Sequence, residues 1–136
     1  MLSNLVSNAV KYTPAGRIEI SLRQESTWAV LEVRDTGIGI PAGELDQLFS
    51  EFFRASNARR SQVPGTGLGL AGVRALVKHL GGELALQSRE NEGSRFTVRL
   101  PLQRPRPPLS PVFSETESRL HDQAAAGMPG GRHRAA

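Results

Sequence analysis

Apolar and polar residues alternate with the period of a β-strand in two parts of the chain. In the first part, alternating runs cover residues 18–23 and 28–34, with a short polar segment between them. In the second part, they cover 84–86 and 96–100, on either side of a turn that contains Gly93. Each pair of runs predicts an antiparallel hairpin with one buried face. The apolar side chains expected on the buried face of the first strand are Ile18, Ile20 and Leu22.

Two other segments carry their apolar residues at helical spacing. Residues 2–12 fit a helix that ends before Pro14, and residues 68–80 fit a second helix that ends at the glycine pair 81–82. The apolar positions expected in these helices are Leu2, Leu5, Val6 and Ala9 in the first, and Leu68, Ala71, Leu76, Val77 and Leu80 in the second. The order of helix, hairpin, long mixed segment, helix and hairpin favours an α+β fold, in which the sheet and its helices form a two-layer sandwich.

The composition changes near Pro101, which marks the end of the predicted domain. Residues 101–136 hold six of the nine prolines, together with runs of alanine and glycine. Such a segment has too few large apolar groups to offset the entropy of ordering it. The sequence therefore predicts one domain at 1–102 and a disordered tail at 103–136, in which residues 105–108 could alternatively serve as a proline-rich docking peptide.

Length and charge exclude several functional classes. The chain of 136 residues allows one domain with a core, and it has neither an apolar run long enough to cross a membrane nor a signal-peptide pattern at its start. It contains no cysteine, so a disulfide or a thiolate metal site is excluded. The net charge of +4 is spread along the chain, since residues 1–102 carry 12 basic and 10 acidic side chains. We therefore expect a cytoplasmic chain that itself contacts no nucleic acid and no membrane.

Two glycine clusters, at 35–41 and 65–70, are the main chemical feature of the chain. Glycines leave backbone N–H groups accessible, and the second cluster precedes a helix whose N-terminal amides attract phosphate. Asp35 heads the first cluster at the end of a strand, where its carboxylate can accept a hydrogen bond from a donor such as the adenine amine. A P-loop is excluded because no lysine follows the second cluster, and a dinucleotide-binding βαβ unit is excluded because the sheet is built from hairpins.

Three polar residues share one face of the first predicted helix. Asn4, Asn8 and Lys11 lie four and three residues apart, which places them on the same side. An amide oxygen is a type of ligand that Mg²⁺ accepts, and an ammonium group can bind phosphate. These residues therefore form either a face that binds Mg²⁺ and phosphate or an ordinary solvated polar face.

Five segments combine into a pattern that resembles the catalytic, ATP-binding domain of sensor histidine kinases. Residues 4–14 resemble the N box of these enzymes, 35–41 the first glycine box, 48–54 the phenylalanine box, 65–70 the second glycine box and 93–96 the closing motif. The resemblance implies a Bergerat (GHKL) fold, shared with gyrase, heat-shock chaperone and MutL-type ATPases, with a mixed, mostly antiparallel sheet packed against helices. It also implies that ATP and Mg²⁺ are the cofactors.

The resemblance implies roles for individual residues. Asn8 matches the Mg²⁺ ligand, Asp35 the acceptor for the adenine amine, and Arg54 the lid arginine that reaches the terminal phosphate. The residues expected to bind the nucleotide are Asn8, Lys11, Tyr12, Asp35, Gly37, Gly39, Ile40, Gly65, Thr66, Gly67, Leu68, Gly69, Leu70 and Ser94. The residues expected to act in catalysis are Asn4, Lys11 and Arg54.

Further expectations concern the lid and the reaction. Phe49 and Phe52 should anchor the lid to the core, whereas Arg59 and Arg60 should face solvent. In the ATPase relatives, a glutamate at the position of Asn4 serves as general base toward water, and an amide has no useful basicity near neutral pH. The missing base favours phosphoryl transfer to a protein nucleophile over hydrolysis.

The histidine that would accept the phosphoryl group is not found in this chain. In the family it is followed by an acidic residue and then by a Thr-Pro or Asn-Pro step, and His79, His121 and His133 do not fit that pattern. The chain also begins within the N-box helix, so we expect a truncated product or a misplaced start, and the missing first strand would leave a sheet edge unpaired. The expected partners are a histidine-containing dimerisation domain and, indirectly, the receiver domain of a response regulator. A parent kinase could be membrane-anchored.

The resemblance leaves two other functions open. A stand-alone regulatory protein of this fold would bind a partner such as a sigma or anti-sigma factor, although the well-formed lid motif with Arg54 disfavours this function. An inactive truncated fragment would bind no nucleotide. The favoured hypothesis is a protein-histidine kinase domain that binds Mg-ATP and belongs to a two-component system.

Overall fold

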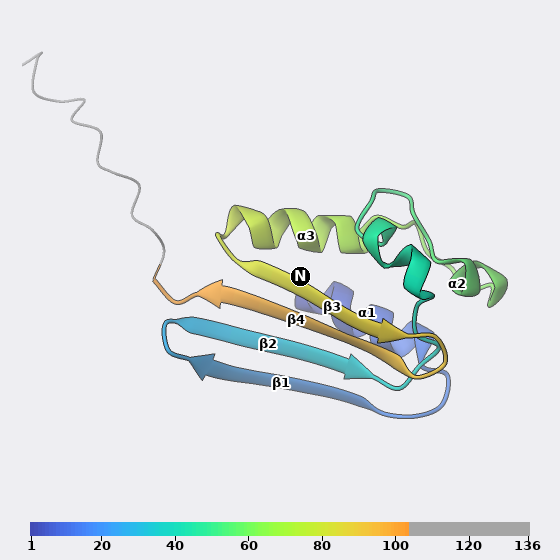
Figure 1. The fold of residues 1–136 in the computed structure, drawn as a ribbon, viewed down its shortest axis with the longest axis horizontal. Helices are drawn as coiled ribbons and strands as arrows, with labels where there is room; N and C mark the ends of the chain where they lie inside the picture. The colour runs from blue at the N-terminus through green and yellow to red at the C-terminus, as the bar shows by residue number, and fades with distance from the viewer. Residues whose placement is uncertain (104–136) are drawn as a thin grey trace, which may run out of the picture. The chain divides into compact units, whose positions relative to one another are not determined.

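The computed structural model describes residues 1–103, whose helices and strands follow the expected order (Figure 1). In chain order these elements are α1 (Leu2–Tyr12), β1 (Ile18–Glu25), β2 (Trp28–Asp35), the 3₁₀ helix η1 (Ala42–Gln47), α2 (Ser56–Arg60), α3 (Gly69–His79), β3 (Glu83–Arg89) and β4 (Gly93–Pro101). The two long helices and the two hairpins predicted from the sequence are confirmed, with small differences at their ends. The predicted disordered tail lies, from residue 104 on, outside the described residues.

The four strands form one sheet in the order β1-β2-β4-β3. The hairpins β1–β2 and β3–β4 are joined by the pairing of β2 with β4, in a register that places Asp35 opposite Ser94. This pairing brings together the first glycine cluster and the closing motif, which are far apart in the sequence. Within residues 1–103 every pairing is antiparallel, so the parallel pair that a mixed sheet implies does not occur there.

Helices α1 and α3 pack against one face of the sheet. The buried core contains residues from both helices and from the two central strands; they include Leu5, Ala9, Val33, Val73, Val77, Phe96 and Val98. Val33 and Phe96 are opposite one another in the register, so their side chains lie on the same face. The result is the two-layer α+β sandwich predicted from the order of the elements.

The buried side of α3 agrees with the prediction at Val77 but not at Leu68 and Leu76. It is centred on Val73 and Val77, whereas Leu68 and Leu76 are 42% and 40% exposed. Leu76 and Val77 are adjacent, so they point to different sides of the helix and only one of them can face the sheet. Neither α3 nor any other helix in residues 1–103 is long and apolar enough to cross a membrane.

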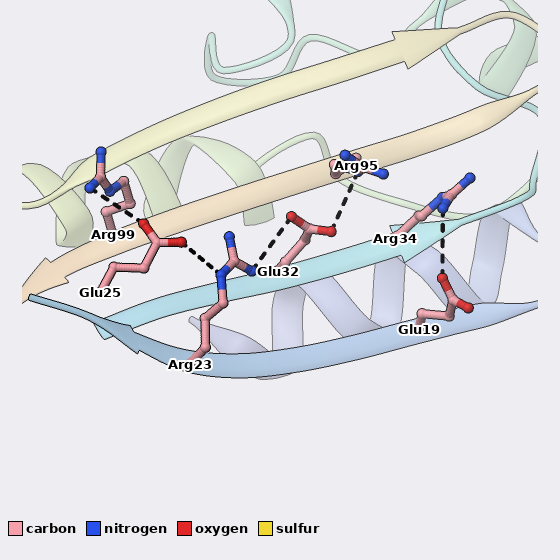
Figure 2. Close-up of polar contacts among 7 residues, drawn as sticks. All are labelled: Glu19, Arg23, Glu25, Glu32, Arg34, Arg95 and Arg99. Atoms are coloured by element: carbon pink, nitrogen blue, oxygen red, sulfur yellow. Dashed lines mark hydrogen bonds and ion pairs between the residues drawn. The ribbon is translucent and has the colours of Figure 1, made fainter. Parts of the chain in front are cut away.

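On the other face of the sheet, charged side chains form a network of ion pairs (Figure 2). Glu25 contacts Arg23 at 2.7 Å and Arg99 at 3.6 Å, and Glu32 contacts Arg23 at 3.9 Å. Val30 lies between Arg23 and Arg99 in the register and is only 1% exposed. The cross-strand neighbours of Val30 are Arg23 and Arg99, and the aliphatic stems of such long side chains can cover an apolar neighbour while their charged ends stay in water.

Two of the three apolar side chains of β1 that were expected to be buried are exposed, contrary to the prediction, whereas Ile18 packs against the core. Ile20 is 52% exposed and Leu22 is 73% exposed, although their cross-strand partners Val33 and Leu31 lie in the core or against it. Ile20 and Leu22 are exposed because β1 is an edge strand and α1 packs mainly over β2. Alternation predicts which side chains share a face, but not whether a second layer covers that face.

Candidate functional site

Most of the predicted site residues meet in one cavity, which is formed by α1, both glycine clusters, the segment between them and the ends of β2 and β4. Its volume is about 250 Å³. The predicted site residues that line it are Asn4, Asn8, Lys11, Tyr12, Asp35, Gly39, Ile40, Arg54, Gly65, Thr66, Gly67, Gly69, Leu70 and Ser94. Gly37 and Leu68 are not among the lining residues. All five segments singled out in the sequence therefore contribute to one site.

Asp35 supplies a buried carboxylate at the end of β2, where it is 7% exposed. Its Oδ1 accepts hydrogen bonds from the backbone N–H groups of Gly37 at 2.9 Å and Ser94 at 3.3 Å. Burial raises the pKa of the Asp35 carboxyl from its ordinary value of 3.8, and the two backbone bonds, together with a hydrogen bond from the Thr13 side chain, oppose that rise. Both backbone bonds are made to Oδ1, so Oδ2 has the capacity to accept a hydrogen bond from the nearby Thr13 hydroxyl or from a molecule in the cavity that Asp35 lines.

The first glycine cluster is held against the β3–β4 hairpin. The backbone N–H of Ile40 donates to Ser88 Oγ at 2.9 Å. Gly39 has a φ of +62°, and a Cβ at this position would lie 1.8 Å from the carbonyl oxygen of Arg89, so only glycine fits here. These contacts fix Ile40, which is 8% exposed, as an apolar part of the cavity wall.

Helix α1 contributes the polar face that was predicted from residue spacing. Asn4 Nδ2 donates to the carbonyl oxygen of Gly69 at 3.3 Å, which connects the first turn of α1 to the start of α3. Asn8 is half-buried one turn further along, and Lys11 and Tyr12 follow in the last turn of the helix. All four residues line the cavity, and Asn4 and Lys11 are also exposed to solvent.

Arg54 and Tyr12 both approach the start of the second glycine cluster. A Cβ at Gly65 would lie 3.8 Å from Arg54 Nε and 3.9 Å from the Tyr12 hydroxyl. One terminal nitrogen of Arg54 donates to the carbonyl oxygen of Val63, whereas Nε is buried and has no hydrogen-bond partner among the described residues. A buried donor without a partner costs about 1–3 kcal/mol, so an anion that accepts a bond from Nε would stabilise this arrangement.

The N-terminus of α3 adds backbone donors beside these side chains. The helix begins at Gly69, and no side chain caps it. The first N–H groups of a helix have no partner within the helix, and the helix dipole is positive at this end. The second cluster and Arg54 together are therefore suited to phosphate groups.

The segment 48–64, which we call the lid, connects to the second cluster through the backbone. The N–H of Phe52 donates to the carbonyl oxygen of Gly67 at 3.1 Å. Phe52 has a φ of +63° and is 72% exposed, so the prediction that it anchors the lid to the core is wrong. The left-handed backbone lets its N–H reach Gly67 while the ring faces solvent. Phe49, as predicted, and Phe53 pack against the core.

Asn57 holds the lid to the first glycine cluster and was not predicted. It is 9% exposed, and its Nδ2 donates to the carbonyl oxygens of Gly39 at 2.9 Å and Ile38 at 3.4 Å. Arg59 and Arg60 in the same helix are exposed, as predicted. An asparagine within a polar segment carries no sequence signal that distinguishes such a bridge from a solvated side chain.

The fold and the site together define a class of protein. The cavity of this α+β sandwich combines a buried carboxylate acceptor, an apolar wall, an arginine and a helix N-terminus. Such a cavity suits a ligand that carries both an amine and phosphates. Residues 1–104 match the family described as "Histidine kinase-, DNA gyrase B-, and HSP90-like ATPase". The chain belongs to this family, and two of the relatives named below, RcsC and MprB, are sensor histidine kinases.

The similarity to individual histidine kinases covers the described domain. The chain is 42% identical over 102 residues to the sensor histidine kinase RcsC of Escherichia coli strain K12, which covers 75% of this chain and 11% of RcsC. The solved structure of the mycobacterial sensor histidine kinase MprB is 36% identical with a TM-score of 0.64, covering 72% of this chain and 67% of that one. Full-length ShkA in complex with AMPPNP is 29% identical with a TM-score of 0.62, covering 74% and 20%.

Proposed function

We propose that this chain binds Mg-ATP in the cavity and that, within a two-component sensor histidine kinase, it presents the γ-phosphoryl group to a histidine of a dimerisation domain. The observation that carries the proposal is Asp35, a buried carboxylate that lines the cavity and whose backbone hydrogen bonds are both made to Oδ1. Arg54 lines the same cavity and has a buried, unpartnered Nε in the described part of the chain.

Recognition of adenine follows from the acceptor chemistry of Asp35. Adenine presents an amine donor on its N6 edge, whereas guanine presents a carbonyl oxygen at the corresponding position. Asp35 Oδ2 would accept from the adenine amine and would repel the guanine carbonyl. Ile40 would pack against the base, since it is buried and lines the cavity.

The phosphate chain is assigned to the second cluster and its neighbours. The free N–H groups at the start of α3, from Gly69 on, would donate to phosphate oxygens. Arg54 Nε and the Lys11 ammonium would add positive charge where the terminal phosphate lies.

Asn8 is suited to hold Mg²⁺. Its amide lines the cavity on the same helix as Lys11, and Mg²⁺ commonly takes one or two oxygen ligands from the protein together with phosphate oxygens and water. When bound, the ion neutralises charge on the phosphates.

The chemistry at position 4 supports transfer to a protein over hydrolysis. Asn4 is an amide whose Nδ2 donates to the backbone of α3, and it cannot take a proton from water. In the proposed transfer, a histidine nitrogen of the partner domain forms a bond to the γ-phosphorus. The bond from that phosphorus to the β–γ bridging oxygen breaks, and its electron pair leaves on ADP. Arg54 would stabilise the charge on the transferred group.

The phosphoacceptor domain is proposed as a partner, in cis within a longer protein or in trans, because the chain spans only 11% of RcsC. A response-regulator receiver domain would then take the phosphoryl group from that histidine. We propose a cytoplasmic location for the site, where ATP is available.

Titration calorimetry of the full chain with Mg-ATP and Mg-GTP tests the proposal. We expect an affinity for Mg-ATP at least about tenfold higher than for Mg-GTP, because a site built around one hydrogen-bonding edge rejects the base that lacks it. Binding of neither nucleotide, or equal binding of both, would contradict the proposed role of Asp35.

A further inference from the structure

Three polar residues, Asp35, Ser94 and Ser88, lie in one row across the sheet. Strand β4 lies between β2 and β3 (Figure 1), and its Ser94 pairs with Asp35 on one side and with Ser88 on the other. Residues directly opposite one another in adjacent strands have their side chains on the same face. Asp35 and Ser94 line the cavity, whereas Ser88 is not among its lining residues.

The Ser88 hydroxyl takes part in three hydrogen bonds. Its Oγ donates to the carbonyl oxygen of Gly93 at 2.9 Å and accepts from the backbone N–H of Ile40 at 2.9 Å. It also lies 2.9 Å from Ser94 Oγ. A serine hydroxyl has one proton to donate and two lone pairs that accept. Because a carbonyl oxygen can only accept, the single Ser88 proton is engaged at Gly93, and the bond between the two serines is donated by Ser94.

This bond fixes the polarity of the Ser94 hydroxyl. Ser94 is 9% exposed and lines the cavity. Its backbone N–H donates to Asp35 Oδ1, while its hydroxyl proton is directed to Ser88. The lone pairs are therefore the part of the Ser94 hydroxyl that remains for a ligand. Beside the Asp35 carboxylate, the wall of the cavity presents a second hydrogen-bond acceptor.

An acceptor at this point favours adenine over a base that has a carbonyl group in place of the amine. Adenine carries an N6 amine, whereas guanine and hypoxanthine carry a carbonyl oxygen at the corresponding position. A hydroxyl held as an acceptor binds a donor on the ligand, directly or through one water, but it cannot donate to a carbonyl oxygen. If the proton of Ser94 were released from Ser88, the same hydroxyl would be free to turn and donate to that carbonyl.

We propose that Ser88 is a positioning residue that determines base specificity from outside the cavity, because it holds the Ser94 hydroxyl as an acceptor. The inference rests on the proposed binding of Mg-ATP in this cavity, and it adds a second group that selects the adenine edge beside Asp35. Since the Ser88 hydroxyl also accepts from Ile40, it connects the apolar wall of the cavity to this acceptor.

Titration calorimetry of the full chain with Mg-ATP and Mg-ITP tests the proposal. Hypoxanthine, the base of ITP, differs from adenine only along the edge that carries the amine. The wild type should bind Mg-ATP at least about tenfold more tightly than Mg-ITP. In Ser88→Ala the Ser94 proton is released, so the ratio of the two affinities should fall about threefold to tenfold. Ser88→Thr keeps a hydroxyl and should keep the ratio of the wild type.

A second substitution separates this role from a general contribution to the structure. Ser94→Ala removes the acceptor itself, so the further change Ser88→Ala should weaken the binding of both nucleotides by the same factor and leave their ratio unchanged. A merely structural role of Ser88 would weaken both nucleotides equally in the presence of Ser94 as well. Ser88→Cys, whose thiol accepts hydrogen bonds only weakly, provides the same comparison if Ser88→Ala does not fold.

The outcomes distinguish this inference from the proposed function. A wild-type chain that binds neither nucleotide, or binds both equally, would overturn the two together. A wild type that prefers Mg-ATP would leave the role of Asp35 intact but overturn that of Ser88 under any of three results. These results are an unchanged ratio in Ser88→Ala, an equal fall of the ratio when Ser94 is already alanine, and a Ser88→Thr variant that behaves like Ser88→Ala.

Discussion

Replacing Asp35 with asparagine should remove adenine recognition while the fold is kept. In Asp35→Asn, the side-chain oxygen can still accept the backbone N–H groups of Gly37 and Ser94, so the end of β2 keeps its contacts. The atom in place of Oδ2 becomes an NH₂ group. This NH₂ group would face the adenine amine, so two hydrogen-bond donors would oppose each other. The charged oxygen that accepts a hydrogen bond in the wild type would be replaced by a group that cannot accept one.

The expected loss of affinity follows from these two changes. A hydrogen bond to a charged group contributes about 1.5–3 kcal/mol, and a buried donor left without a partner costs about 1–3 kcal/mol. A combined loss of about 3–4 kcal/mol lowers the affinity for Mg-ATP several-hundredfold, since each 1.4 kcal/mol is about tenfold. Calorimetry measures the loss, with Asp46→Asn as control, because Asp46 is an exposed carboxylate that does not line the cavity. An affinity within about threefold of the wild type would refute the assignment.

The same substitution should change how stability depends on pH. The pKa of Asp35 is raised in the folded state, so the stability that its protonated form provides is fully present below 3.8 and is lost as the pH rises through the folded-state pKa. The asparagine variant does not titrate there. Its free energy of unfolding without ligand should therefore increase, relative to that of the wild type, from acid to neutral pH. Urea unfolding at several pH values measures the difference, and a difference that is constant with pH would contradict the role of burial.

Three other substitutions test separate parts of the site. Arg54→Ala should weaken ATP binding about tenfold but leave adenosine binding unchanged, since the side chain is assigned to phosphate; calorimetry that shows an equal loss for both would contradict this. Gly39→Ala should lower the free energy of unfolding by at least about 2 kcal/mol, because its Cβ would lie 1.8 Å from the carbonyl oxygen of Arg89; near-normal stability in urea would be inconsistent with that contact. Asn57→Ala should speed amide hydrogen exchange in α2, whereas Arg59→Ala should not, because only Asn57 donates hydrogen bonds to the first glycine cluster. Equal exchange rates in both variants would contradict this role of Asn57.

Sequence periodicity predicted the elements of this fold but not all of their surroundings. α1 and the two hairpins follow from local spacing, because each element repeats its apolar positions with its own period. The pairing of β2 with β4, which brings Ser94 to Asp35, is a long-range contact that no local pattern contains. The exposure of Ile20 and Leu22 likewise depends on where α1 packs, which is a tertiary property.

The candidate site was predictable where chemistry and spacing coincide. Glycines next to a strand end or a helix start indicated Asp35 and the second cluster, and helical spacing placed Asn4 and Asn8 on one face. Phe52 was misplaced because a left-handed backbone at a phenylalanine has no sequence signature. Asn57 was missed because its role depends on two backbone carbonyls that only the folded lid brings near.

In the proposed function, the first glycine cluster binds the adenine and the second glycine cluster binds the phosphates of the same nucleotide in one cavity. The most direct measurement is a titration of the isotope-labelled chain with Mg-AMPPNP, followed through its backbone amide NMR signals. We predict that the signals of Gly37 and Ser94 shift together with those of 65–70 and at the same ligand concentrations, while that of Ser21 on β1 does not follow. Shifts in only one of the two clusters, or no shifts in either, would contradict the claim.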